Sequence, residues 1–360
     1  MPNMFLGFPF DPELFLLQWS QEQDPVKLAM LQSGAVTNSA EIRRMIANGS
    51  NLYTIPFYDV LGGTPDNYDG ESDITMSEPS GKYQTGVVYG RAHSWKDRDF
   101  VHDFNSGADP MKVITSQVAK FWQKKRQQTM LKILNGVFGI TAPTGADADT
   151  TALYAAWKNH TYNIAAVKPS SGSATISDDN KFGATTLGDA IQKALGDNAS
   201  IVSMVWMHSR VAQNLANLQL LQFRKYTDPQ GIERTLQIAD LNGITVIVDD
   251  DCPVADSEAA TGAKEYTSYV MGAGSLLYAP APVKTPSEVG REELTGGGYD
   301  FLVTRLRETY HPNGFIWTMP AGTDGKLVIS PTDTQLGTAA NWSLATNPKL
   351  IPMVKIVTNG

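Results

Sequence analysis

Apolar side chains recur at helical spacing over one long segment in the first half of the chain. Asp109 is placed to cap a helix, Pro110 suits its first position, and MKVITSQVAKFWQKKRQQTMLKILN continues without a breaker as far as Gly136. The residues that form its apolar face are Ile114, Val118, Phe121, Trp122, Leu131, Ile133, Leu134 and Val137. About 26 residues at 1.5 Å each give roughly 39 Å, longer than a typical globular helix. Since QKKRQQ in its middle is polar all round, we expect part of this helix to be solvated or to contact another surface.

Short apolar runs predict a compact α/β lobe further along the chain. DAIQKALG and SRVAQNLANLQLLQF have the pattern of helices, whereas IVSMVWM, GITVIVDD and EYTSYVMGAGSLLYAP each read as one buried strand. This alternation predicts a small open sheet with helices on its faces. After Pro286, alternating residues predict long strands at 299–307 and 315–319 around a turn at 311–314, and LIPMVKIVTN is the final strand candidate.

Two stretches have the pattern of exposed structure. Residues 61–108 alternate polar and apolar positions in SDITMS and in KYQTGVVYGRAHSW, which predicts a long, mostly solvated β-hairpin with its turn near residues 79–81. An exposed hairpin invites aggregation unless a partner covers it. Residues 141–185 are rich in Ala, Thr, Ser, Gly and Asp, and SSGSATISDD within them has the composition of a flexible loop.

The first 60 residues read as an extended arm. GFPFDP and YTIPFYDV hold too many prolines for compact regular structure. One helix is predicted between them, with Asn38 as its cap, Glu41 reaching back to the cap, and Asn48 and Gly49 ending it.

Composition narrows the function classes. With 360 residues, 42% of them apolar, the chain can bury a large core and divide into two or more lobes. A formal charge of -8 argues against a sequence-wide affinity for nucleic acid, because neutralising phosphates requires clustered Lys and Arg. The single cysteine, Cys252, excludes an internal disulfide and a multi-cysteine metal site, and it is expected to be a buried apolar residue in a reducing compartment.

The ends and the hydropathy predict no targeting or membrane segment. The N-terminal MPNMFLGFPFDPELFLLQW lacks a basic leader and a small-residue cleavage site, so it does not read as a secretory signal. An uncharged apolar run of 18 residues is also missing from the sequence. These two features predict a soluble protein, made inside the cell, without a membrane partner.

GITVIVDDD, which ends at Asp251, raises the question of a metal-dependent phosphate site. Such a site needs a GxxxxGK loop followed by Ser or Thr, and the nearest string, GTDGKL at 322–327, has glycines too close together and no hydroxyl. A second string, Gly272-Ala-Gly274, lacks the third glycine of a dinucleotide loop. Consecutive aspartates on a strand point to opposite faces, so residues 249–251 read better as a strand end that leaves the core.

The other candidates for catalytic or ligand-binding residues have little support in the sequence. The five histidines show no metal-ligand spacing, and although His208 follows a buried strand, it reads as a helix-start or surface residue. No GxSxG motif supplies a nucleophile, and the sequence around Cys252 offers no base. Lys124, Lys125 and Arg126 suit a solvated face or a subunit contact. We therefore predict no enzyme, no catalytic or metal residue and no cofactor.

One long segment resembles a known family. From Ser94 to Gly139 the sequence SWKDRDFVHDFNSGADPMKVITSQVAKFWQKKRQQTMLKILNGVFG is similar to the hairpin exit and spine helix of tailed-bacteriophage major capsid proteins. IVSMVWMHSRVAQNLANL, DLNGITVIVDDDCP and YTSYVMGAGSLLYAPAP look like the central lobe of that family, in the same order. The matching pieces extend from about residue 40 to 318, and the serine-rich stretch 168–185 and the last ~30 residues match no motif.

The resemblance implies an α+β architecture, the Johnson fold of tailed-phage and herpesvirus shells. It divides the chain into an N-terminal arm at 1–60, an extended hairpin loop at 61–108, a peripheral domain at 109–187 and 286–319 with its spine helix at 109–136, and a central axial α/β domain at 188–285 and 320–360. In that fold the hairpin of one subunit lies over its neighbour, so its exposed edge would be covered between chains.

The function implied by the resemblance is a structural one. The chain would form hexamers and pentamers of an icosahedral virion shell around packaged double-stranded DNA, without sequence-specific binding, after synthesis in the host cytoplasm. Because only about 60 residues precede the hairpin, a separate scaffolding protein, or none, is expected in place of a cleaved leader, together with a portal and, in some shells, a decoration protein. Two alternatives stay open: a nanocompartment shell of the same fold around enzyme cargo, and a Mg²⁺-dependent α/β enzyme using residues 249–251.

Overall fold

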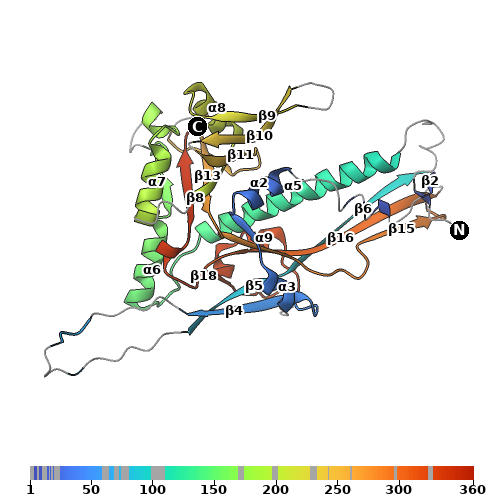
Figure 1. The fold of residues 1–360 in the computed structure, drawn as a ribbon, viewed down its shortest axis with the longest axis horizontal. Helices are drawn as coiled ribbons and strands as arrows, with labels where there is room; N and C mark the ends of the chain where they lie inside the picture. Colours follow the sequence, from blue (N-terminus) through green and yellow to red (C-terminus); the bar gives the residue numbers. More distant parts are fainter. Residues whose placement is uncertain are drawn as a thin grey trace.

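A long helix crosses the molecule between two sheets (Figure 1). The structure is a computed structural model, and it describes residues 4–5, 8–9, 14–15, 17, 19, 25–58, 65–68, 73, 81–98, 110–168, 174–196, 202–227, 233–241, 243–259, 262–295, 298–322 and 327–360. Its helices are α2 (Pro25–Gln32), α3 (Ala40–Ile46), α5 (Pro110–Phe138), α6 (Ala148–Lys158), α7 (Thr186–Leu195), α8 (Ser209–Asn217) and α9 (Asp333–Leu336). The short 3₁₀ turns are η1 (Asp178–Asn180), η3 (Ala339–Asn341) and η4 (Pro348–Leu350). Within these residues no helix is long and apolar enough to cross a membrane.

The first sheet, which we call the axial sheet, has eight strands. Their order is β7 (Thr161–Asn163), β19 (Met353–Thr358), β13 (Lys264–Gly272), β8 (Val202–Met207), β11 (Ile244–Val248), β10 (Glu233–Leu241) and β9 (Gln222–Thr227), and β12 (Val254–Asp256) pairs with β13. Side chains alternate between its faces with the period of two expected of a strand. In β8, Val205 and Met207 pack with α7 and α8, whereas Met204 and Trp206 belong to the core that the end of α5 and α6 complete.

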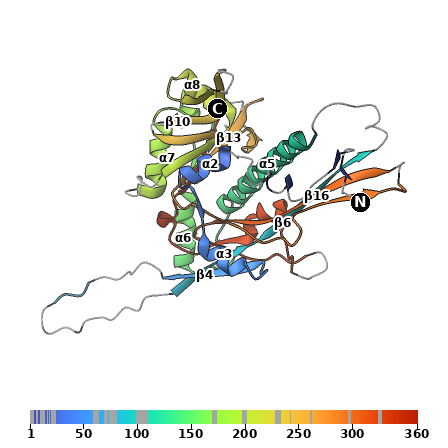
Figure 2. The same ribbon diagram turned by 45° about the vertical axis from the view of Figure 1, so that its right-hand side comes forward.

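The second sheet, which we call the long-strand sheet, is built on β16 (Tyr299–Pro312). Its other strands are β6 (Tyr89–Arg98), β14 (Leu276–Pro280), β15 (Ser287–Glu292) and β3 (Val36–Asn38). β16 pairs antiparallel with β6, β14 and β15, and β6 and β16 run side by side in both ribbon views (Figure 2). Val118 and Trp122 of α5 pack against Leu302 of β16, so the long helix is anchored along this sheet.

Three small two-stranded sheets complete the fold. They pair β4 (Leu52–Tyr58) with β5 (Gly81–Val87), β17 (Phe315–Trp317) with β18 (Trp342–Leu344), and β1 (Met4–Phe5) with β2 (Phe8–Pro9). The β4–β5 sheet is a hairpin stem whose two antiparallel strands lie to the right of the lower end of α6 in Figure 1. It is joined to the long-strand sheet through β16 and through α3.

Most of the strongly periodic segments are confirmed. The long helix begins at Pro110 and ends at Phe138, two residues later than predicted, and its proposed cap Asp109 lies outside the described residues. The strands predicted at IVSMVWM and GITVIVDD and the long strand after Pro286 are β8, β11 and β16, and the helix DAIQKALG is α7. Cys252 is a buried free thiol, as predicted.

One strand of the predicted hairpin is confirmed, and its described partner was not predicted. KYQTGVVYGRAHSW forms β5 and β6, and β5 pairs with Leu52–Tyr58, in the YTIPFYDV segment that was expected to be irregular. The other predicted strand, SDITMS, lies outside the described residues except for Asp73. Pro56 is tolerated because β4 pairs only with β5 among the described strands, and an edge strand can lack one backbone donor.

Two local boundaries also differ from the prediction. The cap of α3 is Ser39, whose hydroxyl accepts from Ile42 N, while Asn38 ends β3. EYTSYVMGAGSLLYAP is not one strand but two, β13 and β14, which lie in different sheets. The chain turns there because Gly274 adopts a positive φ of 71°.

Two helix predictions need correction as well. The segment 141–185, for which no helix was predicted, contains α6, which Asp147 caps by accepting from Thr150 N and which buries Tyr154 and Trp157. The helix predicted for SRVAQNLANLQLLQF ends at Asn217, and its last residues enter strand β9. Propensity alone missed α6 because its Thr and Asp residues favour caps and turns, which offsets the helix preference of its alanines.

Candidate functional site

A buried ion pair holds the long helix against the long strand. Arg126 Nε of α5 donates to Glu308 Oε2 of β16 over 3.0 Å, and the two side chains are 17% and 2% exposed. Burial raises the pKa of the Glu308 carboxyl, while the adjacent guanidinium acts in the opposite direction. The Tyr89 and Tyr310 hydroxyls lie in the same buried region and make no hydrogen bond to a described residue. A charge buried this deeply requires its partner, so α5 and β16 are held in one relative position.

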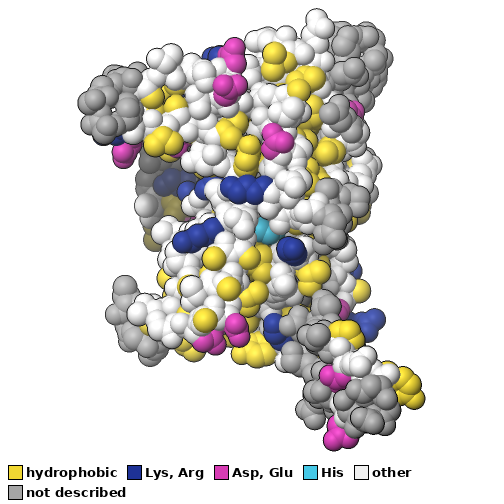
Figure 3. All heavy atoms as spheres, turned by 90° about the vertical axis from the view of Figure 1, so that its left-hand side faces the viewer, with side chains coloured by type: hydrophobic (Ala, Val, Ile, Leu, Met, Phe, Trp, Pro, Cys, Tyr) yellow, Lys and Arg dark blue, Asp and Glu magenta, His cyan; other side chains and the backbone are white. Residues whose placement is uncertain are grey.

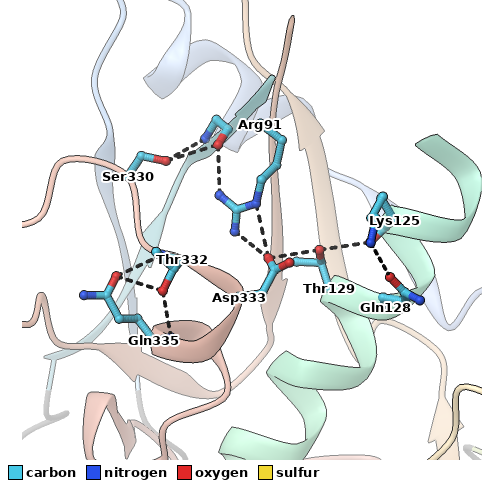
Figure 4. Close-up of polar contacts among 9 residues, drawn as sticks. Arg91, Lys125, Gln128, Thr129, Ser330, Thr332, Asp333 and Gln335 are labelled. Atoms are coloured by element: carbon cyan, nitrogen blue, oxygen red, sulfur yellow. Dashed lines mark hydrogen bonds and ion pairs between the residues drawn. The ribbon is translucent and has the colours of Figure 1, made fainter. Parts of the chain in front are cut away.

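A second polar network ties the C-terminal part of the chain to the same helix (Figure 4). Asp333 Oδ1 accepts from Arg91 Nη2 of β6 over 2.6 Å and from Thr129 Oγ1 of α5 over 3.3 Å. Beside it, Ser330 Oγ accepts from Gly90 N over 2.9 Å. Thr332 caps the short helix α9 and so fixes the direction in which Asp333 points. The three elements β6, α5 and α9 therefore meet at one carboxylate.

The first two of the three aspartates in GITVIVDDD point to different places. Asp249 Oδ1 accepts from Asp251 N over 2.9 Å and closes the turn after β11, and burial raises the pKa of its carboxyl. Asp250 is 74% exposed, and hydrogen bonding to Ser209 at the start of α8, with His208 Nε2 at 3.8 Å, lowers its pKa. The Asp249 carboxylate therefore stabilises a turn, and the Asp250 carboxylate stabilises the N-terminus of a helix.

The third aspartate reaches the long helix. Asp251 Oδ2 accepts from Gln128 Nε2 over 3.2 Å and lies 3.8 Å from Lys124 Nζ. Among the residues described here, no group of three or more His, Cys, Asp or Glu side chains is arranged to hold a metal ion. Nothing in this geometry supports the magnesium alternative, because each aspartate already has a structural partner.

The other predicted candidates also have structural surroundings. His208 is the N-cap of α8, and its Nδ1 accepts from Arg210 N over 3.0 Å. Lys124 and Lys125 are exposed, as a solvated face predicts, but Arg126 of the same run turns inward to Glu308. The sequence could have indicated that both of these side chains face the core. Arg126 lies four residues after buried Trp122, on the same face of the helix. Residue 308 lies an even number of positions after buried residues 302 and 304, on the same face of the strand.

The base of the β4–β5 hairpin is clamped to β16. The Tyr53 hydroxyl is 2.8 Å from Thr309 Oγ1, which itself donates to Val87 O over 2.8 Å. Gln84 Oε1 accepts from Gly314 N over 2.9 Å. These buried bonds join both hairpin strands to the end of β16, so the stem leaves the body in a set direction.

Close packing reinforces this clamp. A Cβ added to Gly86 would lie 2.3 Å from the ring of Tyr53, so only glycine fits where the ring crosses β5. Arg307 Nη2 donates to Asn51 Oδ1 over 2.6 Å at the start of the hairpin. Burial raises the pKa of the Tyr53 hydroxyl, as expected for a group enclosed by the body.

The opposite face of the same hairpin is open. Tyr58 is 80% exposed and Tyr83 is 57% exposed, and Leu52 on this face is exposed as well. Beside it lies a pocket of about 320 Å³, whose lining residues are Gly81, Lys82, Tyr83, Thr150, Leu153, Tyr154, Ile316, Leu344, Ala345 and Thr346. A hairpin with one clamped face and one aromatic face in solvent can bury the second face only against another molecule.

Comparison with known proteins agrees with this geometry. No family model matches the chain. The major capsid protein of Bacillus phage SPP1 is 30% identical over 331 residues, which covers 91% of this chain and 90% of that protein. The capsid of Ralstonia phage GP4 superposes with a TM-score of 0.52 over 92% of this chain and 88% of that one, at 9% identity.

A second solved capsid shows the same fold. The capsid subunit of cyanophage Pam1 has a TM-score of 0.52 and 12% identity over 94% of each chain. The fold is therefore that of phage capsid proteins, α+β with a spine helix, which is α5. Together with the identity to the SPP1 protein along nearly the whole chain, this shows that the chain belongs to the family of tailed-bacteriophage major capsid proteins, the coat proteins that form the virion shell.

Proposed function

We propose that this coat protein closes into hexamers and pentamers of an icosahedral shell that encloses packaged double-stranded phage DNA. The observation that carries the proposal is the two-sided hairpin. One face is fixed to β16 by buried hydrogen bonds, while the other presents Tyr58 and Tyr83 to solvent. A stem of set direction with an uncovered aromatic face suits a contact that is completed by a neighbouring subunit.

The domain division then assigns a role to each part. The arm is taken as 1–51, because Leu52–Tyr58 belongs to the hairpin stem. The peripheral domain, 109–187 and 286–319, carries the spine helix α5 and the long strands. The axial domain, 188–285 and 320–360, carries most of the axial sheet. The ion pair between Arg126 and Glu308 keeps the peripheral domain rigid while subunits press on each other.

The partners follow from this role. DNA is enclosed without sequence-specific contacts, in line with the formal charge of -8. Synthesis in the host cytoplasm, a separate scaffolding protein, a portal and a decoration protein complete the proposal. The chain acts as a building unit and not as a catalyst, since the candidate catalytic residues found in its sequence have structural surroundings.

The test is the size and content of the particles. The protein is expressed with and without the scaffolding protein of its phage, and purified material is measured by light scattering and negative-stain microscopy. Closed shells of uniform diameter are expected, and particles isolated from infected cells should hold nuclease-resistant DNA of genome length. A monomer that never forms rings or shells would contradict the proposal, and shells filled with an enzyme cargo would favour the nanocompartment.

A further inference from the structure

Two segments of the chain carry basic residues and no acidic ones. Residues 150–177 contain Lys158 and Lys168, and residues 334–360 contain Lys349 and Lys355, but neither segment contains Asp or Glu. In the whole chain acidic residues outnumber basic ones, with 37 Asp and Glu against 29 Lys and Arg. The local charge is therefore opposite in sign to that of the molecule.

The fold brings the two segments together. β7 pairs in parallel with β19, so that Lys355 lies opposite Thr161, and η4 contacts both α6 and α7. Lys193 of α7 joins this group, because its ammonium lies 5.5 Å from the ring centre of Tyr162 on β7. We call the resulting surface the lysine edge, and its members are Lys158, Lys193, Lys349 and Lys355.

Two of the four lysines are not neutralised by a described acidic residue. Lys158 and Lys193 are exposed and form no ion pair with any residue that the structure describes. Asp189 lies one helical turn before Lys193, but it forms no such pair either. Lys355 is half-buried, which lowers its pKa. Seen from the side of α6 and α7, Lys and Arg side chains gather in a band across the middle of the molecule (Figure 3).

The position of this band indicates which partner it meets. Figure 1 looks down the shortest axis of the molecule, and Figure 3 looks along the longest one, so the lysine edge lies at one end of the longest axis, on the side of α6 and α7. In a shell one subunit thick, broad faces meet the interior and the exterior, whereas edges meet neighbouring copies. The net charge of -8 also disfavours DNA as the partner.

A complementary surface exists on the same chain. Between Arg234 and Lys264 the sequence contains no Lys or Arg, and its acidic residues at 240–258 are Asp240, Asp249, Asp250, Asp251, Asp256 and Glu258. Of these, Asp250, Asp256 and Glu258 are exposed, and Asp256 forms an ion pair with Lys264. The start of this segment lies on β10 and β11. Three strands, β19, β13 and β8, separate β11 from β7, a distance of roughly 19 Å at about 4.8 Å per strand. One subunit can therefore use both surfaces at once.

We propose that the lysine edge of one copy binds the acidic segment 240–258 of the next copy, head to tail around each capsomer. This inference rests on the proposed function, since it requires that the chain forms rings. Two different surfaces on one chain make a heterologous contact, which closes into a ring when the rotation per subunit allows it. Like-charged edges repel, so the same charges also select the correct order of subunits.

Charge reversal on the exposed lysines tests the contact. The edge variant is Lys158→Glu with Lys193→Glu, and the control is Lys120→Glu with Lys284→Glu, which changes the net charge equally at exposed positions outside the edge. Unassembled subunits of both should melt within about 3 °C of the wild type, because surface substitutions cost little. At equal concentration the edge variant should yield at least about tenfold fewer shells, and the control should assemble as the wild type does.

A charge swap makes the test specific. A second variant reverses Asp240 and Asp250 to Lys, and it should also fail to assemble alone, with its fold checked by circular dichroism because Asp250 bonds to the start of α8. Mixing it with the edge variant should restore rings of alternating subunits. Assembly by the edge variant alone, equal loss in the control, or a mixture without rings would overturn the contact.

The outcomes also separate this contact from the function on which it rests. If the wild type and the edge variant both form shells, the contact is overturned and the proposed function stands. If edge-variant shells form and lose their DNA, the lysine edge faces nucleic acid instead of a second copy, and the contact is overturned as well. A wild-type chain that forms no shell with its scaffolding protein would overturn both.

Discussion

The junction of α5 with β16 buries charged side chains, whereas the hairpin of β4 with β5 exposes aromatic ones. At the junction, Arg126 and Glu308 meet inside one chain, and both are largely removed from solvent. At the hairpin, one face is closed by hydrogen bonds to the body, while Tyr83 on the other face lies in solvent. The junction is complete in a single subunit, whereas the hairpin is half of a contact.

This difference separates folding from assembly. Changes at the junction should reduce the stability of the single subunit, because they leave a buried charge without its partner. Changes on the open face should leave the subunit folded, because those side chains have few contacts to lose, and should act only when subunits meet. Measuring unassembled subunits and shells in parallel distinguishes the two regions.

The largest effect on the subunit is expected from Arg126→Ala. The substitution leaves the Glu308 carboxylate buried without its cation, and breaking a buried pair in this way costs about 3–5 kcal/mol of unfolding free energy. The measurement is urea unfolding of unassembled subunits. As a control, Arg126→Met combined with Glu308→Leu should recover most of the loss, since no charge then stays buried. Equal stability of Arg126→Ala and wild type would show that the pair is not buried as described.

Overpacking at the hairpin base should have the next largest effect. The methyl group of Gly86→Ala would meet the Tyr53 ring at 2.3 Å, and displacing a packed ring costs about 1–3 kcal/mol. The matched control is Gly81→Ala on the same strand, where a Cβ has nothing within 4 Å. Urea unfolding should separate the two variants, and similar values for both would contradict the clamp. Shell yield should fall for Gly86→Ala alone, because the stem loses its set direction.

Sequence reasoning succeeded where one periodic pattern decided the structure. The spine helix follows from a cap, a proline and an unbroken apolar face, and β16 follows from strict alternation. The predictions failed where a distant partner decides. Pro56 suggested irregular chain, but residues 52–58 become a strand by pairing with 81–87, and α6 forms because Trp157 is buried in the core. No local pattern contains those contacts.

For the functional surfaces, as for the fold, the sequence indicated local features but not their distant partners. The idea of an uncovered hairpin came from alternation alone, which found β5 but missed its partner strand at 52–58. Helical spacing from Trp122 could have shown that Arg126 faces inward, but only the fold identifies Glu308 as its partner. Asp333 gives no signal in its own segment, because its contacts, Arg91 and Thr129, lie more than 200 residues away.

A smaller, pH-dependent effect is expected from His311 at the end of β16. Burial lowers its pKa from 6.5 to about 3, and neither ring nitrogen has a hydrogen-bond partner among the described residues. Because the folded pKa lies below the unfolded one, this histidine contributes stability that is complete above pH 6.5 and declines as the pH falls toward 3. The slope approaches about 1.4 kcal/mol per pH unit for one proton.

Urea unfolding of unassembled subunits at pH 7 and pH 5 measures this slope. In His311→Gln the titrating group is absent, so the loss of stability between the two pH values should be smaller than in the wild type by roughly 2 kcal/mol. His160, which burial also shifts to a lower pKa, stays in both proteins and accounts for part of the remaining slope. Identical slopes in the two proteins would mean that His311 is accessible to solvent, and the hairpin base would then be looser than the clamp implies.

The smallest effect on the subunit, and the sharpest test of the comparison, is expected on the open face of the hairpin. Tyr58→Ser with Tyr83→Ser removes two exposed rings, so the unfolding free energy of the subunit should change by no more than about 0.5 kcal/mol. Shell yield should nevertheless fall at least about tenfold, because aromatic side chains at the centre of a contact contribute most to binding. Tyr68→Ser, at another exposed tyrosine between the two strands, tests whether the effect belongs to the stem or extends beyond it. Normal shells from the double variant would remove the open face from the assembly contacts and leave the lysine edge as the surface through which subunits recognise each other.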